Sequence, residues 1–507
     1  MKKKSKALWL IPGLIVLFYL LLHVINLVKL PVFADESIYI RWTQLIIDDW
    51  QRYLFFPLND GKTPLFIWLL LPFQFIFQNQ LFAGRILAVI IGLIQMFIVK
   101  KIIKAWKLKK RYQYLGMLLV CCLPFWYFHH RMALMDGLLT LWASLIILFT
   151  HSLIVNFKNK KIAMKSILFN GLALGAGLLT KLPMLLLVPT LFLPIVFSFK
   201  KIKKADKLKL LIYQSFSLLI GGVMFVALKL HPAFSQLFSR GSDFLYPWQE
   251  IVFNQAWRQT MGNIPTYLNY FIQYLTWPIL LLSIFSLFGQ HKKMSLALHL
   301  SWLSYALPIF IMGRVVYPRY LFPVSIFITL AAILGIKDLL DKQKVFKLLA
   351  VCLVLISGFV SGKFIYYSLV NHNKIPFVSA DRVQYLTEWS AGYGVKETVE
   401  LIQTLTPDHS VLVLSEGYFG TLPDGLLMYL HRRDVTNLYI TGIGQPIYGF
   451  SPEILTLAPE YDQVLLVGNS HRLQLNLAEG KLLLENCRPF NSPCHQVWDI
   501  TKLVQIN

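Results

Sequence analysis

The chain has 507 residues, is 56% hydrophobic, carries a formal net charge of +24 at pH 7 and has a mean hydropathy of +0.57. Soluble globular chains contain roughly 45–50% apolar residues, so this composition argues against a soluble protein and makes the lipid bilayer a predicted partner. The basic residues stand in short stretches between apolar runs, which argues against a nucleic-acid partner.

The apolar residues form runs long enough to cross a hydrocarbon core, which takes about 20 residues per helix. The first run, Leu8–Val28, is longer than the core of a signal peptide and lacks a small-residue cleavage site, so we predict a retained helix. With it, the runs predict about eleven membrane helices, the others being 81–99, 112–128, 138–155, 167–179, 183–199, 210–228, 268–288, 296–312, 320–336 and 345–366. The small residues of 171–177 are also compatible with close packing of two helices in place of a separate span.

The basic clusters provide an independent test of this count. With eleven spans and a cytoplasmic N-terminus, every cluster falls on the cytoplasmic side, as the positive-inside rule requires. We therefore predict a multi-pass protein of the plasma (inner) membrane whose charge orients the chain and contacts lipid headgroups. The clusters are 1–6, 100–111, 158–165, 200–207, 291–293 and 337–347.

The same count leaves the loops 29–80, 129–137 and 230–266, and the tail, on the outer side. Hydrophobicity falls after about residue 367, and the strand-like runs VLVLSE, NLYITG and QVLLVG alternate with helix-like stretches. The predicted fold is therefore a polytopic α-helical membrane domain over 1–367, followed by an extracytoplasmic soluble α/β domain over 368–507.

Two features of the tail leave alternatives open. Cys487 and Cys494 flank RPFNSP, and an oxidising compartment would permit a disulfide between them, but their spacing does not decide it. Gly392 and Gly394 precede a predicted helix. We favour a tight turn and helix start there, with an anion-binding turn as the alternative.

Carboxylates and cations recur in the predicted outer loops. ADESIYIRW places Asp35 and Glu36 just beyond the first helix, and adjacent carboxylates this close to hydrocarbon are costly unless hydrated, paired or used. HHRMALMDG adds a second group, and GRVVYPRY a third. Hydration explains each group alone. Their recurrence on one face suits transfer from a phosphate-linked donor, because a carboxylate can deprotonate an attacking hydroxyl while cations stabilise the departing phosphate.

Six motifs in order resemble the GT-C superfamily of polyprenyl-phosphate-sugar glycosyltransferases. They are DESIYIRW, GKTPLFIWLLLPF, LFAGRILAVIIG, RMALMDGLLT, LGAGLLTKLPMLLLVP and YPRYLFPVSIF, spanning about 35–330. The resemblance is greatest to the branch that holds protein O-mannosyltransferases and the lipid A aminoarabinose transferase. It implies an inverting enzyme that moves sugar from a polyprenyl-phosphate-linked donor to a protein, lipid or glycan acceptor at the outer face.

The resemblance also implies residue roles. Asp35 is the expected base or orienting carboxylate, and Glu36 supports it. The expected catalytic positions are Asp35, Glu36 and Asp136, and the expected donor-phosphate ligands are Lys62, Arg319, Arg131 and Lys181. His129 and His130 are open to two interpretations, proton transfer or simple hydration.

One position departs from the family pattern. In the lipid A branch an acidic residue directly precedes the lysine, whereas Gly61 precedes Lys62 here and Asp60 stands one position further back. We therefore expect no cofactor, with a divalent metal as the alternative.

Two other functions share the predicted spans and outer charges. A transporter or flippase for lipid-linked sugars more often shows internal repeats and broken helices at the midplane, which the sequence does not display. A non-catalytic envelope assembly protein would have no need of Asp35. The sequence leaves the sugar and the acceptor class open.

Overall fold

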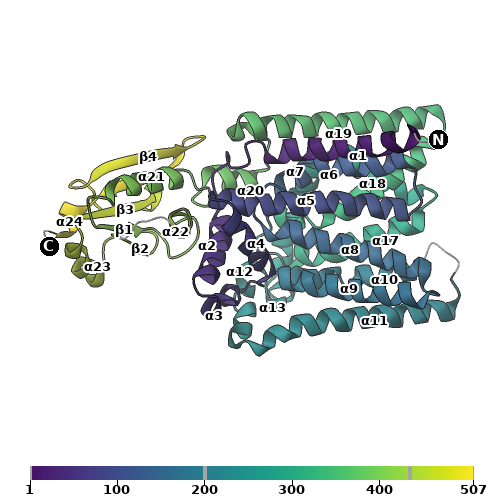
Figure 1. Cartoon of the computed structure of the whole chain (residues 1–507), viewed down its shortest axis with the longest axis horizontal. Coiled ribbons are helices and arrows are strands. Elements are labelled where there is room, and N and C mark those ends of the chain that lie inside the picture. The colour runs from purple at the N-terminus through teal and green to yellow at the C-terminus, as the bar shows by residue number, and fades with distance from the viewer. Residues whose placement is uncertain (1–2, 198–201, 432–436, 506–507) are drawn as a thin grey trace. The chain divides into compact units, whose positions relative to one another are not determined.

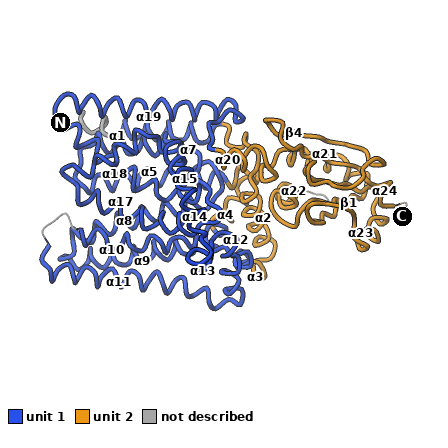
Figure 2. The backbone as a smooth tube through the Cα atoms, turned by 180° about the vertical axis from the view of Figure 1, so that it is seen from behind, with its two compact units in different colours: residues 1–25, 54–68, 85–378 blue, residues 26–53, 69–84, 379–507 orange. Residues whose placement is uncertain are grey.

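The computed structural model describes residues 3–197, 202–431 and 437–505. Backbone contacts divide the chain into two units, which Figure 2 colours separately. We call residues 1–25, 54–68 and 85–378 the membrane unit, and residues 26–53, 69–84 and 379–507 the sheet unit. The contact boundary after Val378 lies near the predicted domain boundary after residue 367, which itself stays a prediction.

The membrane unit consists of long apolar helices lying side by side (Figure 1). In the described part of the chain, seven helical segments are long and apolar enough to cross a membrane, and three apolar helical segments are shorter. The seven are Gln80–Ala105, Met135–Asn156, Lys160–Thr180, Lys204–Leu230, Ala256–Phe288, Lys292–Met312 and Lys344–Val370. The shorter ones are Leu10–Val24, Leu65–Ile76 and Leu182–Val196.

Each predicted apolar run is largely helical, although the first run ends in a turn at 25–28, and residues 198–199 lie outside the described residues. The number of crossings, about eleven, stays a prediction. Some runs are interrupted where proline removes a backbone donor. The run 112–128 becomes α6 (Lys110–Cys122) and α7 (Pro124–His129), and the run 183–199 becomes η2 (Leu182–Leu187) and α10 (Pro189–Val196).

The glycine-rich stretch 171–177 is part of a long helix and also packs closely against neighbouring helices. It lies within one continuous helix, α9 (Lys160–Thr180); Gly171 and Gly175 face α11 (Lys204–Val226), whereas Gly177 faces Met184 of η2. A Cβ at Gly171 would come within 2.6 Å of Ile220, and one at Gly175 within 2.5 Å of Met224. Small residues are thus required where these two helices touch.

The predicted outer loop 29–80 is largely helical. It contains α2 (Ala34–Asp48), α3 (Trp50–Tyr53), η1 (Phe56–Asp60) and α4 (Leu65–Ile76). Helix α4 has 12 residues, which is short for a span, and two prolines flank or interrupt it. Because α4 is so short, it does not stand out in the sequence as a run of about 20 apolar residues.

The sheet unit holds a five-stranded sheet of order β2-β1-β3-β5-β4. Its strands are β1 (Val411–Ser415), β2 (Leu438–Gly442), β3 (Gln463–Asn469), β4 (Lys481–Arg488) and β5 (Ser492–Asp499). The first three pair in parallel, while β5 runs antiparallel to β3 and β4. The three strand-like runs recognised in the sequence are therefore confirmed as the parallel core.

Side chains of β1 alternate between two hydrophobic cores, as the period of two in a strand requires. Val411 and Val413 join the core that includes α21 (Val395–Leu405) and α22 (Asp424–Leu430). Leu412 and Leu414 join the opposite core, beside α23 (Pro452–Leu457) and α24 (Thr501–Gln505). Both faces are covered, so the α/β prediction for the tail is confirmed.

The start of the first predicted outer loop folds together with the tail. The Ala34 amide donates to the Ser390 carbonyl at 3.0 Å, and the Gly392 amide donates to the Val32 carbonyl at 2.8 Å. Gly394 has a φ of +81°, which favours glycine, and it begins α21. The structure confirms the predicted tight turn and helix start at Gly392 and Gly394.

Cys487 and Cys494 face each other across β4 and β5 and form a disulfide. This disulfide answers the question that the spacing of the two cysteines left open. Cys121, Cys122 and Cys352 are free, and all three lie in helices of the membrane unit.

Candidate functional site

A buried ion pair occupies one end of the membrane unit. Asp136 lies in the first turn of α8 (Met135–Asn156), and Lys181 follows directly after α9. Because these helices are antiparallel neighbours, the start of one meets the end of the other, and Lys181 Nζ lies 2.7 Å from Asp136 Oδ1. The Asp136 side chain is 4% exposed. The α8 N-terminus additionally stabilises the carboxylate.

Arg319 and Tyr320 complete this cluster. Lys181 Nζ lies 4.7 Å from the centre of the Tyr320 ring, and Arg319 Cζ lies 5.3 Å from the same centre. Arg319 is 5% exposed, and the hydroxyl of Tyr305 donates to the Tyr320 carbonyl at 2.9 Å. Two predicted cations from distant segments thus meet on one aromatic ring, and Asp136 joins them through Lys181. We call Asp136, Lys181, Arg319 and Tyr320 the cation cluster.

Lys62 belongs to a second polar group in the same unit. Its ammonium lies 2.7 Å from Asp60, and Asp60 also binds Arg240 of the 230–266 loop. Gly61 has a φ of +70°, and this left-handed residue turns the chain so that Lys62 reaches back to Asp60. Gly61, which departs from the family pattern, is therefore favoured by the backbone conformation at this position. Asp60 pairs with Lys62 from one position further back.

Arg131 lies elsewhere and has a structural role. Its guanidinium donates to the Leu22 carbonyl at 2.6 Å and to the Ile25 carbonyl at 3.0 Å, which satisfies orphan acceptors at the end of α1 (Lys3–Val24). Its predicted place near the donor phosphate stays a prediction. His129 and His130 are buried, and His129 stacks on Phe322. Burial of both rings contradicts the hydrated surface histidines considered from the sequence.

Asp35 and Glu36 lie in the sheet unit, in the first turn of α2. Glu36 is fully buried, and its Oε2 accepts the Phe33 amide at 3.1 Å, which fixes the start of the helix. Asp35 is only partly buried. Glu36 therefore holds the turn, while Asp35 keeps a solvent-facing part and the stabilisation that a helix N-terminus gives to a negative charge.

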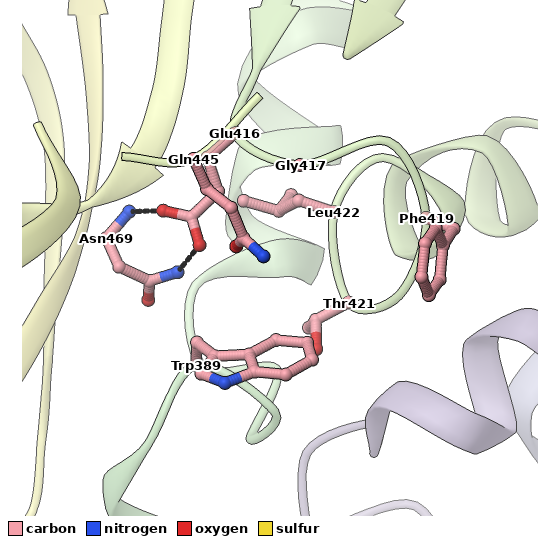
Figure 3. Close-up of a pocket in the computed structure, with 8 residues that line it drawn as sticks. All are labelled: Trp389, Glu416, Gly417, Phe419, Thr421, Leu422, Gln445 and Asn469. Atoms are coloured by element: carbon pink, nitrogen blue, oxygen red, sulfur yellow. Dashed lines mark hydrogen bonds between the residues drawn. The ribbon is translucent and has the colours of Figure 1, made fainter. Parts of the chain in front are cut away.

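A second polar site in the sheet unit was not predicted. A pocket opens where β1, β2 and β3 end, and Figure 3 shows its lining, which includes Trp389, Glu416, Thr421, Gln445 and Asn469. Glu416 is 3% exposed and accepts both the amide and the side-chain Nδ2 of Asn469, each at 2.6 Å. The sequence signal was the position of Glu416 directly after the buried run VLVLS, at the carboxyl end of a parallel strand.

Two buried basic groups lie in the same unit. Burial lowers the pKa of Arg488 to about 10, against the opposing effect of Glu416. Burial, followed by the charge of Arg488, lowers the pKa of His495 to about 3. His495 Nε2 lies 2.7 Å from the hydroxyl of Thr398, so a neutral ring is held inside the domain.

Comparison with known proteins agrees with this architecture. Residues 61–225 match the family of dolichyl-phosphate-mannose-protein mannosyltransferases, a segment that contains four of the six motifs. No curated protein sequence matches the chain significantly.

Solved structures resemble the whole chain. ArnT from Cupriavidus metallidurans in the apo state is similar over 99% of this chain and 99% of its own, with 13% identity and a TM-score of 0.60. ArnT bound to undecaprenyl phosphate is similar over 97% of this chain and 98% of its own, with 14% identity and a TM-score of 0.58. The Archaeoglobus fulgidus oligosaccharyltransferase in complex with Zn and sulfate matches 90% of this chain and 68% of its own, with 12% identity and a TM-score of 0.55.

The chain is therefore a multi-pass membrane protein with an ArnT-like fold. The resemblance inferred from the six motifs is confirmed for the fold, and the family match over 61–225 supports it in the sequence.

Proposed function

We propose that this protein is an integral membrane glycosyltransferase that moves a sugar from a polyprenyl-phosphate-linked donor to a protein, lipid or glycan acceptor. The observation that carries the proposal is the cation cluster. It holds Lys181 and Arg319 on the ring of Tyr320, with Lys181 paired to Asp136, at the end of apolar helices. Charges in such a place are costly and mark a function by default. The similarity to ArnT bound to undecaprenyl phosphate supports a lipid phosphate as the anion that these cations receive.

The proposed reaction is a single displacement. An acceptor oxygen attacks the anomeric carbon, the bond from that carbon to the phosphate oxygen breaks, and polyprenyl phosphate leaves with the electron pair. Asp35 takes the proton of the acceptor hydroxyl. Lys181, Arg319 and Lys62 stabilise the charge that grows on the phosphate. One displacement inverts the anomeric configuration.

The proposed location is the plasma (inner) membrane, with a cytoplasmic N-terminus and an extracytoplasmic sheet unit. The basic links support this orientation. Those that join α5 (Gln80–Ala105) to α6, α8 to α9, and α18 (Val324–Leu340) to α19 (Lys344–Val370) lie at the same end of the membrane unit as the start of α1 (Figure 1). Basic links gathered at one end are typical of the cytoplasmic face.

We also propose that transfer uses no divalent metal. Lys181 and Arg319, which both lie over the Tyr320 ring, would supply the positive charge that a metal would otherwise bring to a departing phosphate.

The test is sugar transfer by the purified protein in lipid, with radiolabelled polyprenyl-phosphate sugars and an envelope acceptor mixture. We expect Asp35→Asn to lower transfer by at least about 100-fold, the typical contribution of a positioned general base. Its matched control is Asp49→Asn, which changes the same residue type at the opposite end of α2. Donor binding should survive in both variants.

Equal transfer by Asp35→Asn and the wild-type protein would refute the assigned base. Movement of labelled donor across the bilayer, with no label in any acceptor, would refute the transferase and favour the flippase.

A further inference from the structure

We propose that the sheet unit contains a saccharide-binding site of its own, in the pocket between Glu416, Asn469, Thr421 and Trp389 (Figure 3). Binding there does not depend on the proposed transfer reaction.

The position of the pocket follows from the strand order. β1 lies between β2 and β3, so the chain leaves β1 toward one neighbour and later returns on its other side. Loops that diverge at such a switch point leave a crevice beyond the carboxyl ends of the strands, where open α/β sheets bind ligands. Glu416 follows β1 directly, Asn469 ends β3, and Gln445 lies three residues beyond β2.

Two buried polar atoms in this crevice lack a protein partner. Thr421 and Asn469 are 3% and 2% exposed, and neither Thr421 Oγ1 nor Asn469 Oδ1 has a hydrogen-bond partner among the described residues. A buried polar atom without a partner is destabilising, so such atoms usually bind water or a ligand. In Figure 3, Asn469 Oδ1 is turned away from Glu416, on the side where the Trp389 indole lies.

The chemistry fixes which group the ligand must bring. A carboxylate only accepts hydrogen bonds, so Asn469 must point its Nδ2 at Glu416, which leaves its buried Oδ1 as an acceptor without a partner among the described residues. The ligand must therefore donate to Asn469. Thr421 Oγ1 can donate or accept. A hydroxyl satisfies both positions, because it can donate to one atom and accept from the other.

The charge balance favours a neutral ligand. Glu416 is paired with Arg472, whose Nη1 lies 3.1 Å from Glu416 Oε1. An anion would meet the acceptor oxygens of Glu416 and Asn469, and a cation would meet Arg472. A neutral polyhydroxyl compound meets neither penalty.

Aromatic side chains supply the remaining surface. The Trp389 ring lies under the Arg472 guanidinium, 5.0 Å from Cζ, and Phe419 is 56% exposed. The loop that carries Phe419 has glycines of positive φ at both ends, Gly417 at +74° and Gly420 at +114°. A sugar ring packs its apolar C–H face on an aromatic ring while its hydroxyls reach polar atoms at the edge. The pocket offers both kinds of surface within one crevice.

Saturation-transfer NMR on the full chain in lipid nanodiscs tests the proposal, because sugar-headed detergents would compete for the site. The probes are methyl glycosides of hexoses and pentoses. We expect saturation transfer to at least one glycoside, binding weakened at least about tenfold in Thr421→Val, and the signal lost in Trp389→Leu. Thr421→Val removes a hydroxyl that makes no hydrogen bond in the fold, so its melting temperature should not fall.

The matched control is Ser415→Ala. Ser415 Oγ is also buried without a hydrogen-bond partner among the described residues, but Ser415 does not line the pocket. This control should bind as the wild-type protein does. The proposal is overturned if no glycoside receives saturation, or if Thr421→Val and Trp389→Leu bind glycosides as well as Ser415→Ala does. Neither result bears on sugar transfer, which is measured separately with Asp35→Asn.

Discussion

The membrane unit and the sheet unit both bury a carboxylate beside a cation, but they balance the charge differently. In the cation cluster, Asp136 pairs with Lys181, and a second buried cation, Arg319, lies over the Tyr320 ring that Lys181 also contacts. In the sheet pocket, Glu416 is matched by Arg472 and by neutral donors of Asn469. The first arrangement suits an anion such as a phosphate, whereas the second suits a neutral ligand with hydroxyl groups.

Removing the carboxylate from the cation cluster should have the largest effect. Asp136→Asn leaves Lys181 without its ion-pair partner, and breaking a buried pair in this way costs about 3–5 kcal/mol. We expect a large fall in the melting temperature of the protein in lipid. The double variant Asp136→Asn with Lys181→Met should recover most of that stability without recovering transfer. Unchanged melting in Asp136→Asn would contradict the buried ion pair.

Removing the Arg319 cation tests the proposed phosphate site directly. Arg319→Met should lower transfer by at least about 100-fold, because a fixed donor to a developing phosphate charge is lost. Binding of sugar-free polyprenyl phosphate should weaken in parallel. Arg314→Met is the matched control. Arg314 belongs to the same short loop, but its side chain is 38% exposed and pairs with Glu250 at 3.3 Å. Equal losses in both variants would mean that loop charge in general, and not the cation cluster, binds the phosphate.

The two sites also differ in how far the sequence revealed them. Ionisable residues stand out next to apolar runs, so Asp136, Lys181 and Arg319 were all identified before their geometry was known. The ion pair between Asp136 and Lys181 could not be predicted from the sequence, because these residues meet only through the antiparallel packing of α8 and α9. Arg131 shows the limit of the same reasoning. A sequence reveals a charge but not its partners, and Arg131 donates to two carbonyls at the end of α1.

The sheet pocket gave a much weaker signal. Glu416 and Asn469 are ordinary residues for a soluble domain, and the strands that bring them together are separated by about 50 residues of chain. The strands themselves were predictable, because a short run of buried residues is a local pattern. Their order was not, since nothing local in VLVLSE or QVLLVG states that β3 pairs with β1 on the side away from β2.

The sheet unit should be sensitive to acid. The pKa of His495 falls from its ordinary 6.5 to about 3 on folding, so below pH 6.5 the unfolded chain binds a proton that the folded chain refuses. Above pH 6.5 the neutral His495 ring does not reduce the free energy of unfolding. As the pH falls from 6.5 toward 3, this group lowers the free energy of unfolding by up to about 1.4 kcal/mol per pH unit. Hydrogen exchange at β5 should therefore accelerate between pH 6.5 and 5. His495→Gln should flatten that pH dependence, and a persistent slope would assign it to other groups.

Chelation should have the smallest effect, and it compares the two units once more. In the membrane unit, Lys181 and Arg319 already supply the charge assigned to the phosphate, so EDTA should leave transfer within about twofold of the untreated rate. In the sheet unit, the described residues Glu485, Cys487 and Cys494 lie close enough together to hold a metal, but the two cysteines are joined in the disulfide. A disulfide has no thiolate to offer a metal, so chelation should not change hydrogen exchange at β4 and β5 either. Loss of transfer with EDTA that Mg²⁺ or Mn²⁺ restores would show that the fixed cations do not suffice. Faster exchange confined to β4 and β5 would instead place a metal in the sheet unit.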